Sequence, residues 1–261
     1  MRTANLAVVF SLLALIFAGQ AKAQMPIYLG VKGGISIPNL SAGGNNPVSK
    51  GYSSIEGPYF GAFAEFGLTH CFSIQPELNY VAQGGQKNGQ QAIPSADFAS
   101  AFPPGYQAPE YFYANFKSKA RFNYLELPIL AKFTFSLGGP WKFVADAGPY
   151  VGYLLNGKNV TSDSSNVYAD QGETEELPVG KQSFYGNSSI TDELHRFNFG
   201  IKGGVGLEYF VHHCGYVYLE LGGEYGFENV QKGTINGKNQ TGAATAALGW
   251  AFNLRGRKKK M

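Results

Sequence analysis

The sequence is dominated by segments in which apolar residues alternate with polar or small ones. In residues 125–135 every odd-numbered residue is apolar, whereas Glu126 and Lys132 fall on even positions. Because successive side chains of a strand point to opposite faces, this pattern predicts a strand with one face suited to hydrocarbon and one that is polar. A membrane accepts strands only when they close into a barrel, since open edges would leave backbone groups without partners. The sequence therefore predicts a transmembrane β-barrel.

The connections between these segments are alternately short and long. Outer-membrane barrels have short periplasmic turns, long extracellular loops and an even number of strands, so both termini are expected in the periplasm. We expect an all-β, eight-stranded antiparallel transmembrane barrel of this kind, in the outer membrane of a Gram-negative cell. The expected strands are residues 27–37, 58–67, 71–82, 121–136, 141–155, 195–210, 215–229 and 241–254; the short turns are 68–70, 137–140 and 211–214; the long loops are 38–57, 83–120, 156–194 and 230–240.

The two ends of the chain differ from the barrel region, residues 24–254. Residues 1–23 have an early Arg, an apolar core and an Ala21-Lys22-Ala23 sequence before Gln24, which together indicate a cleaved secretory signal peptide. Residues 255–261 form a basic tail that supplies much of the net charge of +3. Such a tail is typical of a solvated end or of a contact with an anionic surface, and no basic–aromatic module indicates nucleic-acid binding.

The outward face of the predicted strands carries aromatic residues near the strand ends. Girdles of aromatic side chains are typical of the two interfaces of a membrane barrel. A soluble barrel of the lipocalin type would place apolar residues inside, and the many charges on the other face disfavour it. The expected girdle residues are Trp141, Tyr153, Phe197, Tyr209 and Trp250.

The inward face carries charges of both signs. The interior of an eight-stranded barrel is just wide enough for side chains to fill. Because unpaired buried charge is costly, we expect these side chains to pair and to close the lumen. The alternative is a narrow channel for ions or small solutes, since ionisable groups at membrane depth can mark a transport path. The predicted lumen network consists of Lys32, Glu65, Glu77, Glu126, Lys132, Lys142, Asp146, Arg196, Lys202, Glu208, Glu220 and Glu224.

Several motifs resemble those of a known family. They are Gly30-Val31-Lys32-Gly33-Gly34-Ile35-Ser36, Gln75-Pro76-Glu77-Leu78, Tyr124-Leu125-Glu126-Leu127-Pro128-Ile129-Leu130, and Gly200-Ile201-Lys202-Gly203-Gly204 with Glu220 and Tyr225-Gly226. Together they resemble the PorT-like outer-membrane β-barrel proteins of Bacteroidota. The resemblance covers essentially the whole mature chain and implies an eight-stranded outer-membrane barrel. The namesake of that family is implicated in type IX secretion, so an accessory role in secretion or envelope assembly is an expectation from this resemblance. The basic extension after Leu254 departs from barrels that end on an aromatic residue.

Two cysteines and three histidines fall at the predicted short turns. Cys71 and Cys214 could form one disulfide in an oxidising periplasm. Their turns belong to nearly opposite strands, which favours unpaired cysteines, because a bridge needs Cα atoms within roughly 7 Å. His70, His212 and His213 are interpreted as rim residues, so no metal site and no cofactor are expected.

A hydrolytic site is a further alternative. Ser188, Ser189, Asp192 and His195 are residue types found in hydrolases, so a lipid- or peptide-modifying enzyme remains an alternative. Their spacing does not place a nucleophile beside a base, and no Gly-x-Ser-x-Gly segment accompanies the serines. We therefore expect a non-enzymatic protein.

The long loops are the expected working parts. Exposed aromatic residues among prolines suit contact with a protein or a glycan, or a loop folded over the barrel mouth. We expect a structural or interaction protein, most simply a monomer, that contacts outer-membrane lipid and binds partners through these loops. The aromatic residues of the loop 83–120 are Phe98, Phe102, Tyr106, Tyr111, Phe112, Tyr113 and Phe116.

Overall fold

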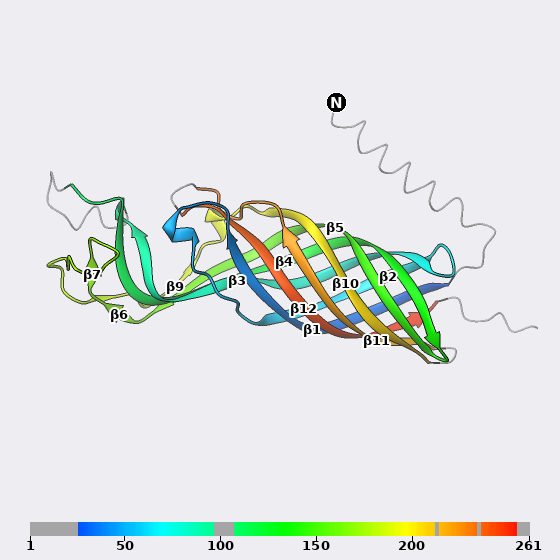
Figure 1. Ribbon diagram of the computed structural model, residues 1–261. Helices are drawn as coiled ribbons and strands as arrows, with labels where there is room; N and C mark the ends of the chain where they lie inside the picture. Colours follow the sequence, from blue (N-terminus) through cyan, green and yellow to red (C-terminus); the bar gives the residue numbers. More distant parts are fainter. Residues whose placement is uncertain (1–25, 97–106, 212–213, 234–235, 255–261) are drawn as a thin grey trace, which may run out of the picture.

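The computed structural model describes residues 26–96, 107–211, 214–233 and 236–254, and eight of their strands close into one antiparallel barrel (Figure 1). The predicted signal peptide, residues 1–23, and the basic tail, residues 255–261, lie outside the described residues. The order around the ring is β4, β3, β2, β1, β12, β11, β10 and β5, and β5 pairs again with β4. These strands are β1 (Ile27–Ala42), β2 (Gly57–Gly67), β3 (Phe72–Pro94), β4 (Tyr111–Gly138), β5 (Trp141–Ser162), β10 (Phe197–Val211), β11 (Gly215–Gly226) and β12 (Asn239–Asn253).

The number, type and order of the barrel strands confirm the prediction. Every strand pairs with its neighbour in the chain, and the first and last strands, β1 and β12, close the ring over Tyr28–Ala42 and Asn239–Asn253. The short turns, the start of β1 and the end of β12 lie at one end of the barrel, which we call the short-turn end (Figure 1). We call the opposite end the long-loop end. No helix among the described residues is long and apolar enough to cross a membrane.

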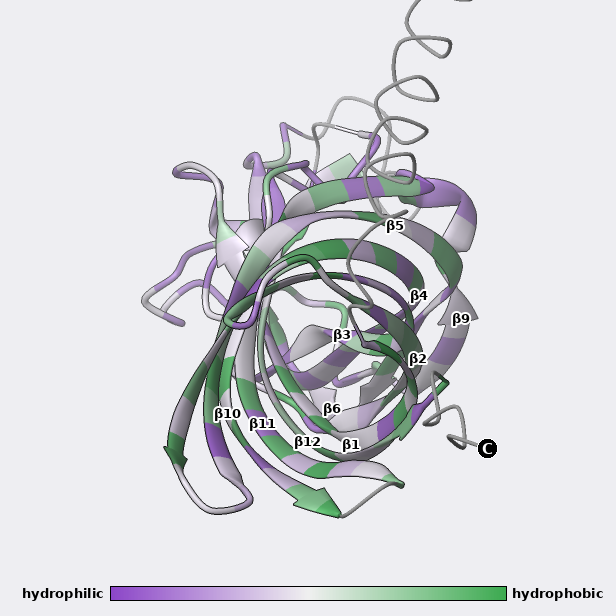
Figure 2. Ribbon diagram, turned by 90° about the vertical axis from the view of Figure 1, so that its right-hand side faces the viewer, coloured by the Kyte–Doolittle hydropathy of each residue, from purple (hydrophilic) through white to green (hydrophobic). Residues whose placement is uncertain are grey.

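The outward face of the barrel is a belt of exposed apolar side chains. Leu127, Leu221 and Leu248 are 58%, 57% and 61% exposed, and the residues two positions away along their strands are apolar or glycine. Viewed along the barrel, apolar and polar residues alternate along each strand of the ring (Figure 2). A continuous belt of exposed apolar side chains suits a hydrocarbon solvent better than water.

Aromatic pairs lie at both ends of the β5–β10 ladder. Trp141 packs against Tyr209 at the short-turn end, with ring centroids 4.9 Å apart. Tyr153 packs against Phe197 at the other end of the ladder, at 5.4 Å. These four outward side chains have the arrangement that interfacial girdles require.

Three strands are much longer than predicted. Residues 83–120 were expected to form a loop, but Gln83–Pro94 of β3 pairs with Tyr111–Phe122 of β4, so most of the described part of this segment is a hairpin. Likewise β5 continues to Ser162. The ladder continues because pairing satisfies the backbone groups and an apolar cluster covers the hairpin, which compensates for a composition rich in Gly and Gln. Gly84, at φ +129°, is required at the start of this extension, since a Cβ there would lie 2.1 Å from the carbonyl oxygen of Ala120.

The extended hairpin forms the base of a lobe beyond the barrel. We call long-loop lobe the extensions of β3, β4 and β5 together with β6 (Ser164–Ser165), β7 (Val167–Tyr168), β8 (Gln182–Ser183) and β9 (Gly186–Ser189). β7 pairs with β4 and β9 pairs with β5, so the lobe continues the barrel sheet (Figure 1). Its core contains Phe112, Ala114, Val167 and Leu177.

Replacing Leu127 with Arg should destabilise the barrel by about 2–4 kcal/mol, because it places a charge on the lipid face of β4. Urea unfolding of the barrel refolded into lipid vesicles, followed by tryptophan fluorescence, measures this change. Leu137→Arg is the matched control: Leu137 is equally exposed, at 60%, but lies next to the β4–β5 turn, so we expect a change within about 1 kcal/mol. Equal effects of the two substitutions would contradict a membrane-embedded belt.

Candidate functional site

The interior of the barrel is filled in three layers. An aromatic layer lies at the short-turn end, a charged layer in the middle and an apolar layer at the long-loop end. The sequence places the layers through the inward residues of every strand, because each strand contributes one side chain to the interior every second residue.

The aromatic layer is built from four strands. Phe63, Tyr216 and Tyr218 are buried, and the rings of Tyr28 and Phe210 pack against them. The ring centroids of Tyr28 and Tyr216 are 5.1 Å apart and those of Phe210 and Tyr216 also 5.1 Å. These edge and tilted contacts are the geometries that aromatic pairs favour, so the short-turn end is packed rather than open.

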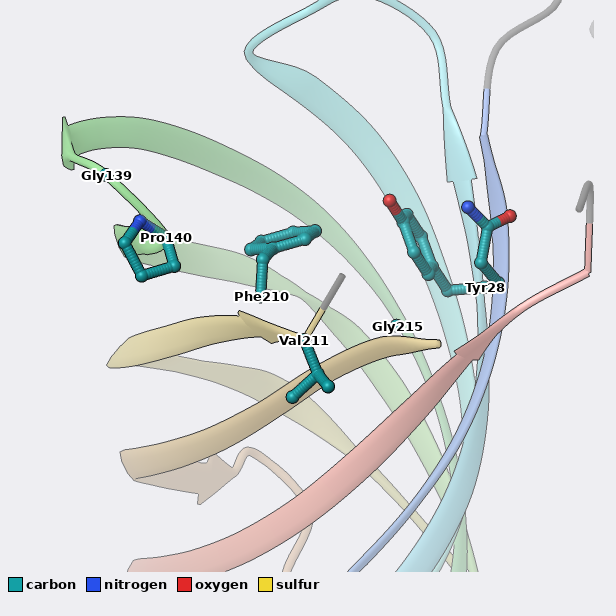
Figure 3. Close-up of a pocket in the computed structure, with 7 residues that line it drawn as sticks. Tyr28, Gly139, Pro140, Phe210, Val211 and Gly215 are labelled. Carbon is teal, nitrogen blue, oxygen red and sulfur yellow. The ribbon is translucent and has the colours of Figure 1, made fainter. Parts of the chain in front are cut away.

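A hollow of about 380 Å³ lies outside this aromatic layer, at the mouth of the barrel. The ring of Phe210 lies between Pro140 and the ring of Tyr28, and all three residues line the hollow (Figure 3). The ring centroids of Tyr28 and Phe210 are 6.2 Å apart in an edge-to-face contact. Because these packed rings form its wall, the hollow ends at the aromatic layer and does not continue into the lumen.

The charged layer is organised around three buried lysines, each between two glutamates. Nine of the twelve side chains predicted for the lumen network are brought together here. They form three groups: Lys32 with Glu77 and Glu220, Lys132 with Glu65 and Glu208, and Lys202 with Glu126 and Glu224. We call each group a lysine–glutamate triad.

In the first triad Nζ of Lys32 lies 2.9 Å from Glu77 and 3.2 Å from Glu220. Glu77 accepts two further hydrogen bonds, from Nε2 of Gln75 and from Nδ2 of Asn79, both at 2.7 Å. A carboxylate that receives only N–H donors is stabilised in its charged form.

In the second triad Nζ of Lys132 lies 2.9 Å from Glu65 and 2.6 Å from Glu208. Lys132 also donates to Oε1 of Gln75 and to the hydroxyl of Tyr216, both at 3.1 Å, and Tyr216 in turn donates to Glu65 at 2.5 Å. This triad therefore joins the charged layer to the aromatic layer.

The third triad lies toward the long-loop end and is less symmetric. Nζ of Lys202 is 2.5 Å from Glu224 but 3.7 Å from Glu126. Glu224 also accepts a hydrogen bond from Nε2 of Gln83. Oε2 of Glu126 has no hydrogen-bond partner, although the residue is only 1% exposed.

The other three predicted network residues have different positions. Asp146 is buried and lies near Glu77 and Glu220, where it adds a seventh carboxyl group to the six glutamates of the triads. Lys142 is half-buried near the short-turn end, with Nζ 3.8 Å from the centroid of the Phe210 ring. Arg196 lies outside the lumen and pairs with Asp192 at 3.1 Å, because its position just before β10 falls in the long connection and not in the strand.

The predicted lumen network contained only charged residues and therefore missed the amide partners Gln75, Asn79 and Gln83. The signal was available, because all three share the inward parity of Glu77 on β3. The distribution of glutamates among the lysines depends on the stagger of neighbouring strands, and the strand pattern alone does not determine it.

The apolar layer closes the long-loop end of the barrel. Residues from strands and loops meet there, including parts of the chain that sequence analysis left as polar loops. It consists of Leu40, Ala120, Phe122, Tyr124, Leu154, Leu194 and Val230, with Tyr52 and Ile190 packed against them.

The long-loop lobe carries a polar hollow of about 480 Å³. Tyr185, which is 70% exposed, lies on its wall, and the ring of Phe116 on the same wall stacks on Phe184 at 4.5 Å. Asp163 has a φ of +89°, a conformation that non-glycine residues rarely adopt, and it pairs with Lys117 at 3.6 Å. Strained backbone of this kind is often retained at binding sites. The hollow is lined by Asn88, Gly89, Asn115, Phe116, Asp163, Ser164, Lys181 and Tyr185.

The aromatic residues predicted for the loop 83–120 have divided roles. Phe112 is fully buried in the lobe core, so its expected exposure was wrong. Tyr111, Tyr113 and Phe116 belong to β4 and are partly buried. Phe98, Phe102 and Tyr106 lie outside the described residues.

The hydrolase residues are not assembled into a catalytic group. Asp192 pairs with Arg196, and Oγ of Ser189 lies 3.1 Å from Oγ1 of Thr191. In the described segment 186–196 no hydrogen bond joins the side chain of His195 to Ser188 or Ser189.

The two cysteines are free and exposed, so the disulfide that the sequence allowed is not formed. Cys71 precedes β3 and Cys214 precedes β11, and these strands are four places apart in a ring of eight. That separation exceeds the roughly 7 Å between Cα atoms that a bridge tolerates. His70 is exposed at this rim, and His212 and His213 lie outside the described residues. Among the residues that the structure does describe, no group of three or more His, Cys, Asp or Glu side chains is placed to hold a metal ion.

A closed ring of two-faced strands with an apolar outer belt, aromatic pairs at both ends and buried charges inside defines a transmembrane β-barrel. The chain belongs to the family described as the outer membrane protein beta-barrel domain, which matches residues 19–232. It is therefore an outer-membrane β-barrel protein. No curated protein sequence matches the chain.

Solved structures of outer-membrane barrels are similar to this chain at low identity. Neisserial surface protein A is 13% identical over 86% of this chain and 96% of its own, with a TM-score of 0.37. Ail, the attachment invasion locus protein of Yersinia pestis, is 10% identical over 86% and 98%, with a TM-score of 0.36. OprG from Pseudomonas aeruginosa is 9% identical over 87% and 96%, with a TM-score of 0.35. These similarities assign no function.

Replacing Lys132 with Met should destabilise the barrel by about 3–5 kcal/mol, because it leaves Glu65 and Glu208 buried without their shared cation. Lys117→Met is the control, since the Lys117–Asp163 pair is exposed and is expected to contribute less than about 1 kcal/mol. Urea unfolding in lipid vesicles compares the two. A small loss for Lys132→Met would show that the triad is not needed to neutralise the interior.

Proposed function

We propose that this protein is a non-enzymatic outer-membrane barrel with a closed lumen, which anchors the long-loop lobe at the cell surface as a binding module. In this proposal both termini face the periplasm and the lobe faces outward, as the distribution of short turns and long loops in outer-membrane barrels suggests. The observation that carries the proposal is the contrast between a lumen filled in three layers and a lobe that has its own packed core.

The filled interior argues against a path for solutes. The aromatic and apolar layers lie at the two ends of the lumen, and the triads occupy the space between them. Ion pairs with short contacts on both sides of a lysine leave its ammonium group few degrees of freedom. An eight-stranded barrel has little room beyond its own side chains, which agrees with this arrangement.

The lobe is built to hold a defined shape. Glu173, in a left-handed conformation at φ +57°, accepts hydrogen bonds from Nε2 of Gln90 at 3.0 Å and from Nδ2 of Asn115 at 2.7 Å. Asp170 accepts from the backbone N–H groups of Thr174 and Glu175, which hold the pKa of this exposed carboxyl below its usual range. The contacts of Glu173 tie the connection after β7 to the β3–β4 hairpin, and those of Asp170 fix the shape of the connection itself.

The hollow favours a sugar ring over a large protein surface. Its volume of about 480 Å³ lies in the range of small-molecule sites, whereas a stable protein interface buries ~1,600 Å² in total. The exposed ring of Tyr185 offers an apolar face, and Asn88, Asp163 and Ser164 offer hydrogen-bonding groups around it. We therefore propose a glycan as the partner; an accessory role in secretion or envelope assembly would use the same lobe.

The closed lumen predicts that the purified protein has no stable conductance in planar lipid bilayers. The second candidate function is a narrow channel for ions, because the triads contain more carboxyl than ammonium groups. A measurable current that depends on these buried charges would favour it. In that case discrete openings would appear for the wild type and would change in ion selectivity when Glu126 is replaced with Gln.

Replacing Tyr185 with Ala should weaken binding to a recognised polysaccharide at least about tenfold, which corresponds to ~1.4 kcal/mol. The measurement is a binding titration of the detergent-solubilised barrel against a glycan panel. Phe227→Ala is the matched control, because Phe227 is 58% exposed but lies outside the lobe, after β11. Binding that survives Tyr185→Ala, or no binding to any glycan, would count against the proposed partner.

A further inference from the structure

The three lysine–glutamate triads contain more acid than base. Each triad has two carboxyl groups and one ammonium group, so full ionisation would leave every triad with a net charge of −1 in the interior of a membrane barrel. Buried uncompensated charge is strongly unfavourable, and a group in that position takes up a proton when it can. The hydrogen-bond partners of the individual carboxyls show where such a proton would be held.

Most of the triad carboxyls with short contacts are surrounded by donors. Glu77 receives Lys32, Gln75 and Asn79, and Glu65 receives Lys132, Tyr216 and Ser73. Glu224 receives Lys202 and Gln83. Donors arranged in this way around Glu77 and Glu65 stabilise a carboxylate.

Glu126 has the opposite surroundings. It is 1% exposed, its Oε2 has no hydrogen-bond partner, and Lys202 is 3.7 Å away. Its carboxyl group and that of Glu224 face the same Lys202 ammonium group, at 3.7 and 2.5 Å, and two carboxyl groups brought together in this way favour a state in which one of them carries a proton.

We infer that Glu126 and Glu224 form a proton-binding site in the lumen, in which Glu126 carries the proton at neutral pH and donates its O–H to the Glu224 carboxylate. The Lys202 ammonium then balances the charge of Glu224, so the third triad is neutral. The site goes beyond the proposed surface function and does not depend on it.

The groups facing this pair from the surrounding strands are compatible with a held proton. Tyr124 on β4 and Tyr150 on β5 are buried and contribute phenol hydroxyls, which are uncharged at neutral pH. Tyr59 on β2 lies 4.6 Å from Nζ of Lys202. Lys32 on β1 and Glu77 on β3 belong to the first triad, in which Lys32 also pairs with Glu220 on β11. β12 contributes Thr241, which is not titratable. No second cation on these strands contacts Glu126, so a proton is the remaining source of positive charge in the described lumen.

The test compares the pH dependence of unfolding for the wild type and for Glu126→Gln. A group that is protonated in the folded barrel and ionised in the unfolded chain makes the folded state bind more protons, so its contribution to stability falls as pH rises above the usual range of Glu, about 4.3. For one proton the unfolding equilibrium constant of the wild type, relative to Glu126→Gln, should rise about tenfold per pH unit above that value until the folded site itself ionises. Urea unfolding of the full barrel in vesicles between pH 5 and pH 9, at constant ionic strength, gives this ratio.

Glu77→Gln is the matched control. Glu77 is equally buried and also faces a lysine, but all its partners are donors. We expect Glu77→Gln to be destabilising and to retain the wild-type pH dependence. Glu126→Gln, whose amide mimics the protonated carboxyl, is expected to be more stable than the wild type at neutral pH and to lose that pH dependence.

Three results would overturn the inference. The first is a wild type and a Glu126→Gln variant whose stabilities run parallel with pH. The second is a stabilisation of the wild type by Na⁺ or K⁺ at fixed ionic strength that Glu126→Gln abolishes, which would identify a metal cation in place of the proton. The third, which needs no variant to fold, is the absence of a protonated-carboxyl infrared band from the wild-type barrel at neutral pH.

Discussion

The width of an eight-stranded barrel is the constraint on which the rest of this structure depends. Every strand must send alternate side chains to hydrocarbon and to an interior that side chains alone can fill. Charged groups in that interior have little water to solvate them, so each must find its partner within the ring. The three lysines answer this requirement by lying between glutamates from other strands, such as Lys132 between Glu65 on β2 and Glu208 on β10. The same narrowness allows a few aromatic and aliphatic residues to complete the filling at each end.

The barrel itself could be predicted because its physical cause is local. Alternation in residues 125–135 places Leu127 outward and Glu126 inward wherever the strand lies in the ring, and the structure has both side chains there. The alternation of short and long connections similarly gave eight strands and their order. Which face of the sheet each residue takes depends only on its position along its own strand, so the sequence of that strand is enough to predict it.

The partner assignments and the lobe depend on relations between distant segments. Whether Lys202 approaches Glu224 or Glu126 more closely depends on the stagger of β4, β10 and β11, and nothing within any one of these strands encodes it. Arg196 was assigned to the lumen because the predicted strand 195–210 included it with inward parity. The strand β10 instead begins at Phe197, and the Arg196 side chain pairs with Asp192. The Gln- and Gly-rich segment after Gln83 has a loop composition, and its strand structure arises from pairing with β4 and from the cluster around Phe112.

The continuous ladder from the barrel into the lobe has a mechanical consequence. β3 and β4 run from the barrel into the lobe without a linker. The ten steps along β4 from Arg121 to Tyr111 extend roughly 33 Å at ~3.3 Å per residue. Rotation or tilt of the barrel must therefore turn the lobe with it. A partner held in the hollow would stay at a nearly fixed height above the membrane, and a pulling force on that partner would be transmitted along hydrogen-bonded strands directly into the lipid-facing belt.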